Sequence, residues 1–139
     1  MNEIIKAFSF RLIEEGRNYK NLVMLSNDSF RDLKLENFRK LFENRAFNFG
    51  MGSENMVSVA QGLSIRGKMP LIAGYCAYTI VKAYEQIRND ICYPNLNVKI
   101  LGAYSGLTAA KLGPGYQILE DISLMASLPN MAVVCPADY

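Results

Sequence analysis

Histidine and tryptophan are both missing from this chain of 139 residues. The lack of histidine removes the commonest general base and the commonest transition-metal ligand of proteins, so no zinc site is expected. The three cysteines, Cys76, Cys92 and Cys135, are odd in number and lack the Cys-x-x-Cys spacing of metal or redox motifs. This cysteine pattern is typical of a reducing cytoplasm, and we expect a cytoplasmic protein.

Charge of either sign is also sparse. The chain has 15 Lys and Arg against 13 Asp and Glu, a net charge of +2, and the two signs are interleaved. No basic stripe suited to nucleic acid is present, and no charged-then-apolar leader opens the sequence. We therefore expect neither a nucleic-acid nor a membrane partner. Half of the residues are apolar, which is enough for one core, so residues 1–139 are predicted to form a single domain.

Apolar residues alternate between helical and strand spacing along the chain. Helices are predicted over 4–16, 35–42, 54–65, 77–90 and 118–127, and strands at 22–25, 47–49, 70–73, 98–101 and 131–135. Strands separated by helices require crossover connections, so the predicted fold class is α/β, a mostly parallel sheet with helices on both faces. Ligands of such sheets usually bind beyond the carboxyl ends of the strands. The loops at 50–54, 74–78 and 104–116 are therefore expected to converge on one site.

The run from Phe47 to Leu63 carries the strongest functional signal. It reads FNFGMGSENMVSVAQGL and resembles FNVGIAEQNMVGIAAGL of the transketolase family. Two later runs, VKAYEQIRNDICYPNLNVKILG and YQILEDISLMASLPNMAVVCPADY, are similar to RAFDQIRNSIAYPNLNVKIVG and HQALEDIALMRSLPNMTVVVPADA of that family. The chain thus resembles the pyrimidine-binding domain of a transketolase, and most of all the separate carboxyl-terminal subunit of two-chain bacterial transketolases.

This resemblance implies the thiamine-diphosphate-binding fold of the pyrimidine type, in a transferase component that supplies the pyrimidine half of the cofactor site. In the family, another domain holds the diphosphate and Mg²⁺ through a GDG-type motif, which this sequence lacks. We therefore expect a diphosphate-binding transketolase subunit as partner, holding Mg²⁺, in a homo- or hetero-oligomer. The family domain also continues beyond the Pro-Ala-Asp motif. The chain is accordingly expected to lack the last helix and strand and the third transketolase domain.

The sequence departs from the family motif at the position of its central glutamate. That glutamate hydrogen-bonds a ring nitrogen of the aminopyrimidine, and the ungapped match places Ser53 there, among the cofactor-binding candidates. A serine hydroxyl can donate a hydrogen bond but has no carboxyl proton equilibrium near neutral pH. Glu54, one place later, is the candidate catalytic acid if the turn is remodelled. Its alternative interpretation is a first-turn acid favoured by the helix dipole.

Three further residues match cofactor-binding positions of the family. Tyr75 and Tyr78 fall where the family presents two aromatic rings to the pyrimidine, and flat rings can stack there with an offset. Both can equally be core residues at a strand end and a helix start. Lys82 falls where many relatives have arginine, and its alternative interpretation is a solvated lysine on a helix surface.

The predicted substrate loop departs further from the family. The family run SHAGLSVGEDGATHQ is here AYSGLTAAKLGPGYQ, so two histidines become Tyr104 and Tyr116, and an acidic pair becomes Lys111 and Leu112. We expect Tyr104, Lys111 and Tyr116 to face the substrate. Phenols titrate near pH 10 and leucine cannot orient a hydroxyl, so ordinary ketose-phosphate chemistry is poorly supported. Two functions remain open: a transferase component with an altered substrate loop, or a catalytically silent relative acting as a structural or regulatory subunit.

Overall fold

A parallel sheet forms the centre of the computed structural model, which describes residues 2–137. Its order is β2-β1-β3-β4, and every neighbouring pair runs parallel. The strands are β1 (Leu22–Ser26), β2 (Ala46–Asn48), β3 (Met69–Tyr75) and β4 (Lys99–Ala103). Because each parallel connection needs a crossover, a helix follows each strand. The predicted α/β class is confirmed.

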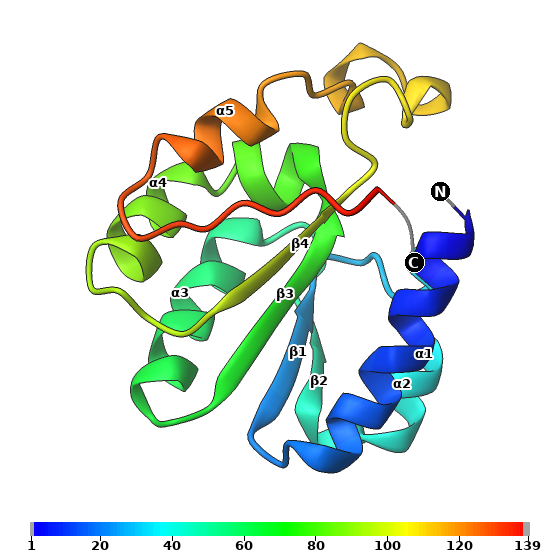
Figure 1. Cartoon of the computed structure of the whole chain (residues 1–139), viewed down its shortest axis with the longest axis vertical. Helices are drawn as coiled ribbons and strands as arrows, with labels where there is room; N and C mark the ends of the chain where they lie inside the picture. Colours follow the sequence, from blue (N-terminus) through cyan, green and yellow to red (C-terminus); the bar gives the residue numbers. More distant parts are fainter. Residues whose placement is uncertain (1, 138–139) are drawn as a thin grey trace.

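Helices cover both faces of the sheet (Figure 1). One face carries α1 (Asn2–Asn18) and α2 (Glu36–Leu41), and the other carries α3 (Ser53–Ile65), α4 (Tyr84–Gln86) and α5 (Asp121–Ala126). Side chains of a strand point alternately to its two faces. Accordingly, Met24 of β1 packs in the cluster under α1 and α2, whereas Val23 and Leu25 pack in the cluster under α3. Two layers of apolar core thus hold the sheet between its helices.

The helix predicted over 77–90 is wrong as one continuous element. A π-helical turn, η2 (Ala77–Val81), is followed by the short α4 and by a second π-helical segment, η3 (Ile87–Cys92). Ala83, which lies between η2 and α4, has φ −103° and ψ 19°, outside the helical region. The residues between 77 and 92 keep a helical spacing of apolar positions, and this spacing does not distinguish α from π turns.

The strand predicted at 131–135 is also wrong. Residues 131–136 have no regular secondary structure, and they cross the sheet beside β4 (Figure 1). This segment and β4 line a cavity of about 590 Å³, with Met131 and Val134 on one side and Ile100 on the other. An apolar run cannot reveal whether it will find a pairing partner. The helix predicted over 118–127 is confirmed only as the shorter α5.

The three cysteines are free thiols. Cys76 and Cys92 are buried, Cys135 is exposed, and none of the three is in a disulfide. Over residues 2–137, no helix combines the length and the apolar character that a membrane crossing needs.

Candidate functional site

The carboxyl ends of the strands bring separate loops to one edge of the sheet. Ser26 at the end of β1 is in register with Ala73 of β3, and Tyr75 at the end of β3 is in register with Ala103 of β4. The segments that follow these strands therefore start side by side, as parallel pairing requires. Of the three loops predicted to converge, those at 74–78 and 104–116 meet in direct ring contacts, while the loop at 50–54 bonds to Asn27 and Lys82.

Four tyrosines at this edge form what we call the tyrosine cluster: Tyr75, Tyr78, Tyr104 and Tyr116. The rings of Tyr75 and Tyr104 are stacked, with centroids 4.5 Å apart and planes 19° apart. Tyr116 meets Tyr75 edge-on at 5.8 Å and Tyr78 edge-on at 5.2 Å. The Tyr78 hydroxyl donates to the Tyr116 hydroxyl at 3.0 Å. Offset stacks and edge-on contacts are the favoured geometries of aromatic pairs.

Asp32 joins the tyrosine cluster from the loop after β1. Its Oδ2 accepts a hydrogen bond from the Tyr75 hydroxyl at 2.8 Å, and its backbone carbonyl accepts one from the Tyr104 hydroxyl at 3.3 Å. Burial, and then the hydrogen bond to Asp32, raise the pKa of Tyr75 above its ordinary value. Burial and the Asp32 charge raise the pKa of Tyr104. Both phenols therefore stay protonated at neutral pH and act as hydrogen-bond donors.

The predicted substrate loop, residues 103–117, begins at the last residue of β4 and has an irregular backbone. Tyr104 has φ 58° and Gly113 has φ 90°. A bulky residue with positive φ is uncommon and persists only where its surroundings fix it. Two short 3₁₀ turns, η4 (Ala110–Leu112) and η5 (Pro114–Tyr116), complete the loop. Lys111 is exposed on η4.

Ser53 opens α3 beside the tyrosine cluster but faces inward. Its side chain is fully buried, and its Oγ accepts a hydrogen bond from Asn27 Nδ2 at 3.4 Å. Asn27 Oδ1 in turn accepts from the Ser29 hydroxyl at 3.2 Å. Both Asn27 and Thr79 pack against Gly74, so closely that a Cβ at Gly74 would collide with them. Asn27, Ser29, Ser53 and Thr79 thus form a buried polar group that carries no formal charge.

The Thr79 hydroxyl belongs to this buried group and has no hydrogen-bond partner among the residues that the structure describes. Its residue is fully buried. An unpaired buried hydroxyl costs free energy, so it stands out in a native core. Its position next to Gly74 places this polar atom directly beneath the edge where β3 ends.

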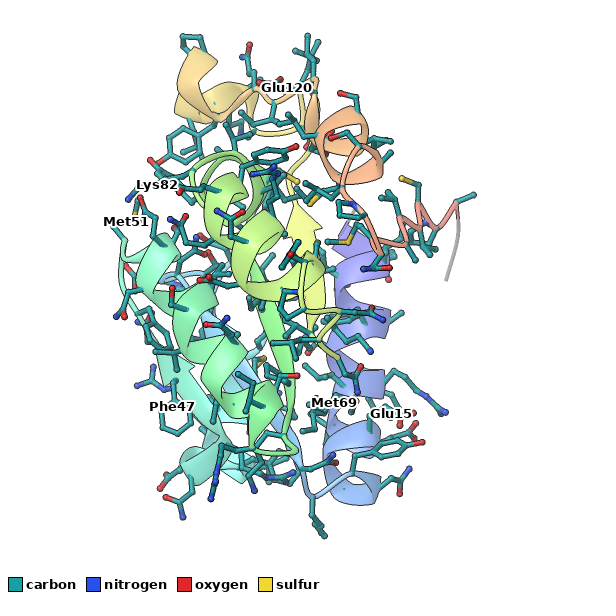
Figure 2. All side chains as sticks on the ribbon, turned by 90° about the vertical axis from the view of Figure 1, so that its left-hand side faces the viewer. Glu15, Phe47, Met51, Met69, Lys82 and Glu120 are labelled. Carbon is teal, nitrogen blue, oxygen red and sulfur yellow. The ribbon has the colours of Figure 1, made fainter. Side chains whose placement is uncertain are left out.

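Glu54 points away from Ser53 and pairs with Lys82. The Lys82 Nζ lies 3.4 Å from Glu54 Oε2, and the two side chains are 40% and 44% exposed. Lys82 also donates to the backbone carbonyl of Met51 at 2.9 Å, and Figure 2 shows Met51 and Lys82 side by side at the start of α3. The structure thus brings these two predicted site residues together on the surface. They belong to a different group from the tyrosines.

Sequence reasoning misses Asn27 and Asp32. Both follow the buried strand β1, in a run whose residue types indicate only a turn. The carboxyl ends of parallel strands share one edge of the sheet. Polar residues in the segment after a buried strand, such as Asn27 and Asp32, are therefore the signal that could have found them.

Comparison with known proteins is consistent along the whole chain. The family model for the transketolase pyrimidine-binding domain matches residues 2–139. A Methanocaldococcus jannaschii protein whose name assigns it as a transketolase C-terminal section is 39% identical over 96% of this chain and 42% of its own length. One of the subunits of apulose-4-phosphate transketolase from Phocaeicola vulgatus is 29% identical over 96% of this chain and 43% of its own. The chain thus spans less than half the length of these relatives.

Solved structures agree with these relatives. A split-gene transketolase described as an inactive β4 tetramer superposes with a TM-score of 0.82 at 40% identity, over 96% of this chain and 42% of that chain. The transketolase of Campylobacter jejuni shares the fold at a TM-score of 0.81 and 16% identity, over 91% of this chain and 20% of that one. The matched family model, the relatives and the fold together show that this chain belongs to the transketolase family, as a pyrimidine-binding domain.

Proposed function

We propose that this chain supplies the pyrimidine half of a thiamine-diphosphate site in a two-chain transketolase-type transferase with an altered substrate loop. The observation that carries the proposal is the tyrosine cluster, in which aromatic residues from β3, η2 and the substrate loop meet at the carboxyl edge of the sheet. The relatives that are named as subunits of transketolases support a two-chain assembly. The partner is a diphosphate-binding transketolase subunit that holds Mg²⁺, and the assembly is cytoplasmic.

The residues present fit one part of the cofactor and not another. Tyr75 and Tyr78 offer aromatic surface for a flat heterocycle, and Tyr104, Tyr116 and Lys111 supply polar groups toward a substrate. No carboxyl stands at the position of Ser53, whose hydroxyl is buried and already bonded to Asn27. The chain's own residues therefore support binding and orientation of the ring. Thiamine diphosphate, when bound, would supply the carbanion chemistry of ketose cleavage.

Binding can be tested with the isolated chain and with its partner. Calorimetry should show weak or no binding of thiamine diphosphate and Mg²⁺ by the chain alone, because several kcal/mol of association cost must be offset by about one stacked ring. A mixture with the diphosphate-binding partner should bind clearly. Tyr78→Ala should weaken that binding roughly three- to tenfold, as expected for loss of an aromatic pair. Tyr93→Ala, at a tyrosine that is 83% exposed elsewhere, serves as control.

One observation favours the second function, a catalytically silent subunit with a structural or regulatory role. Ser53 has no carboxyl and bonds to Asn27, and the carboxyl of Glu54 faces Lys82. The first turn of α3 therefore presents no carboxyl to the tyrosine cluster. Deuterium exchange at the thiazolium carbon of the cofactor, measured in the mixed chains, decides between the two. Exchange faster than that of free cofactor supports the transferase. A bound cofactor that exchanges no faster than free cofactor supports the silent subunit.

A further inference from the structure

We infer that Asp32 is a positioning residue that anchors the substrate loop through Tyr75 and Tyr104, and thereby sets the substrate affinity of the site. The effect on substrate rests on the proposed function. The anchoring is a property of the free chain and can be measured without a partner or cofactor.

Asp32 contacts both tyrosines at once. Its carboxylate accepts from the Tyr75 hydroxyl at 2.8 Å, its carbonyl accepts from the Tyr104 hydroxyl at 3.3 Å, and the two rings stack on each other at 4.5 Å. Tyr75 ends β3 and Tyr104 directly follows β4. One residue of the loop after β1 thus ties together the ends of two other strands.

The backbone that carries Asp32 is firmly held. The next residue, Leu33, donates from its amide to the Ser29 carbonyl at 3.0 Å, and Leu35 donates to the Phe30 carbonyl at 2.8 Å. Leu33 and Leu35 are fully buried in the core under α1 and α2. The Asp32 side chain is exposed, but it stands on a turn that the core fixes. A fixed acceptor loses little entropy when it binds a phenol.

The substrate loop needs such an anchor, since its large apolar residues contribute little burial. Leu107 is 64% exposed and Leu112 is 50% exposed. Tyr104, at the start of the loop, keeps a positive φ of 58°, which neighbouring contacts must stabilise. The stack on Tyr75 and the single bond from its hydroxyl to the Asp32 carbonyl are contacts that restrain its ring.

The anchor implies a division of roles within the tyrosine cluster. Tyr104 covers one face of the Tyr75 ring, so Tyr75 offers a ligand only its remaining surface. Tyr78 is met edge-on by Tyr116 and has no parallel stack with it. Tyr78 is therefore the ring better placed for the cofactor, while Tyr75 orients Tyr104 and Tyr116 toward the substrate.

Hydrogen exchange of backbone amides in the free chain tests the anchor. Asp32→Ala and Tyr75→Phe should each raise exchange rates in residues 103–117 about three- to tenfold, the range for a partly exposed hydrogen bond to a charged group. Asp32→Asn keeps an acceptor oxygen and should restore most of the protection. Asp28→Asn, which removes a charge from the same loop, is the matched control. Unchanged rates in both Asp32→Ala and Tyr75→Phe would overturn the inference, and Tyr75→Phe alone decides if Asp32→Ala does not fold.

Kinetics of the chain mixed with its diphosphate-binding partner test the consequence for substrate. With fructose 6-phosphate as the ketose probe, Asp32→Ala should raise KM about three- to tenfold with kcat and cofactor affinity nearly unchanged. A fall in kcat at constant KM would contradict a positioning role. If the wild-type mixture does not turn over fructose 6-phosphate, the altered loop does not accept this ketose phosphate. Deuterium exchange at the thiazolium carbon then tests the proposed transferase function, and amide exchange in the free chain still decides whether Asp32 anchors the loop.

Discussion

The hydroxyl of Ser53 lies 3.4 Å from the Nδ2 of Asn27, and both side chains are buried. Asn27 comes from the loop after β1 and Ser53 from the first turn of α3, so this bond joins two elements on the same side of the site. A neutral donor and a neutral acceptor satisfy each other here, at the position that resembles the glutamate of the family motif. Where the family motif has a glutamate, this chain thus has a buried serine that is hydrogen-bonded to the buried Asn27.

Replacing Ser53 by Ala should destabilise the fold. The Nδ2 of Asn27 would lose its acceptor in a buried place, which costs about 1–3 kcal/mol in the free energy of unfolding. Ser58→Ala removes an exposed hydrogen bond to Asp90 from the same helix and should cost less, about 0.5 kcal/mol, because water replaces the lost partner. Urea denaturation measures both. Equal midpoints for Ser53→Ala and wild type would show that the 3.4 Å contact contributes nothing.

Ser53→Glu tests whether the family carboxyl can be restored. A glutamate at this buried position would place a charge against Asn27 and Gly74, so we expect a larger loss of stability than for Ser53→Ala. If the variant folds, deuterium exchange at the thiazolium carbon in the mixed chains should accelerate. Exchange no faster than wild type in a folded variant that binds the cofactor would show that the serine is not what limits activation.

The sheet is predictable because its strands are short apolar runs separated by helical periodicity. The runs at 22–25, 70–73 and 98–101 correspond to β1, β3 and β4 with shifts of only a few residues. The segment at 131–135 has the same apolar character but forms no ladder with β4, the edge strand beside it, and an apolar run alone does not report strand pairing. The broken helix around Ala83 escapes prediction for a related reason, since apolar spacing does not report the hydrogen-bond period.

The site is predictable in its residue types and less so in its contacts. Tyr75, Tyr78, Tyr104 and Tyr116 can be named from the resemblance to the family, two in each of two loops, and the parallel register brings the loops together. Asp32 cannot, because its role depends on a tyrosine hydroxyl 43 residues away in the chain. Such a distant pairing leaves no local spacing pattern.

Gly74→Ala should be strongly destabilising. A Cβ at this position would collide with Asn27 Oδ1 and Thr79 Oγ1, and overpacking of this kind typically costs about 1–3 kcal/mol or more. Gly62→Ala is the matched control, because nothing lies within 4 Å of its added Cβ. There the change should be neutral or stabilising by up to about 1 kcal/mol, since alanine favours a helix over glycine. A thermal midpoint of Gly74→Ala equal to that of wild type would contradict the close packing.

Glu54→Gln should have little effect on stability. The ion pair with Lys82 is 3.4 Å long and both side chains are well exposed, so it contributes less than about 1 kcal/mol and is weakened by salt. If the chain works with a partner, activity should also be close to wild type, because Glu54 points at Lys82. Abolished deuterium exchange at the thiazolium carbon in this variant would instead establish Glu54 as the catalytic acid.

The buried thiol of Cys76 should make stability depend on alkaline pH. Burial, and then its hydrogen bond to Asp121, raise the pKa of this thiol from the ordinary value of 9.0 to about 12. Above pH 9 the folded state therefore binds more protons than the unfolded state, and stability falls as pH rises toward about 12. The contribution of this thiol to the free energy of unfolding is fully present below pH 9 and is lost as the pH rises toward about 12.

Removal of the thiol tests this dependence. Between pH 9 and 10, before most phenols titrate, the free energy of unfolding of Cys76→Ala should decline less steeply than that of wild type, although the variant is less stable throughout because it leaves a cavity. Ser58→Ala, which removes an exposed hydroxyl and no thiol, is the control and should keep the wild-type slope. Parallel urea titrations at several pH values measure all three slopes. Identical slopes for Cys76→Ala and wild type would show that Cys76 is not the group responsible.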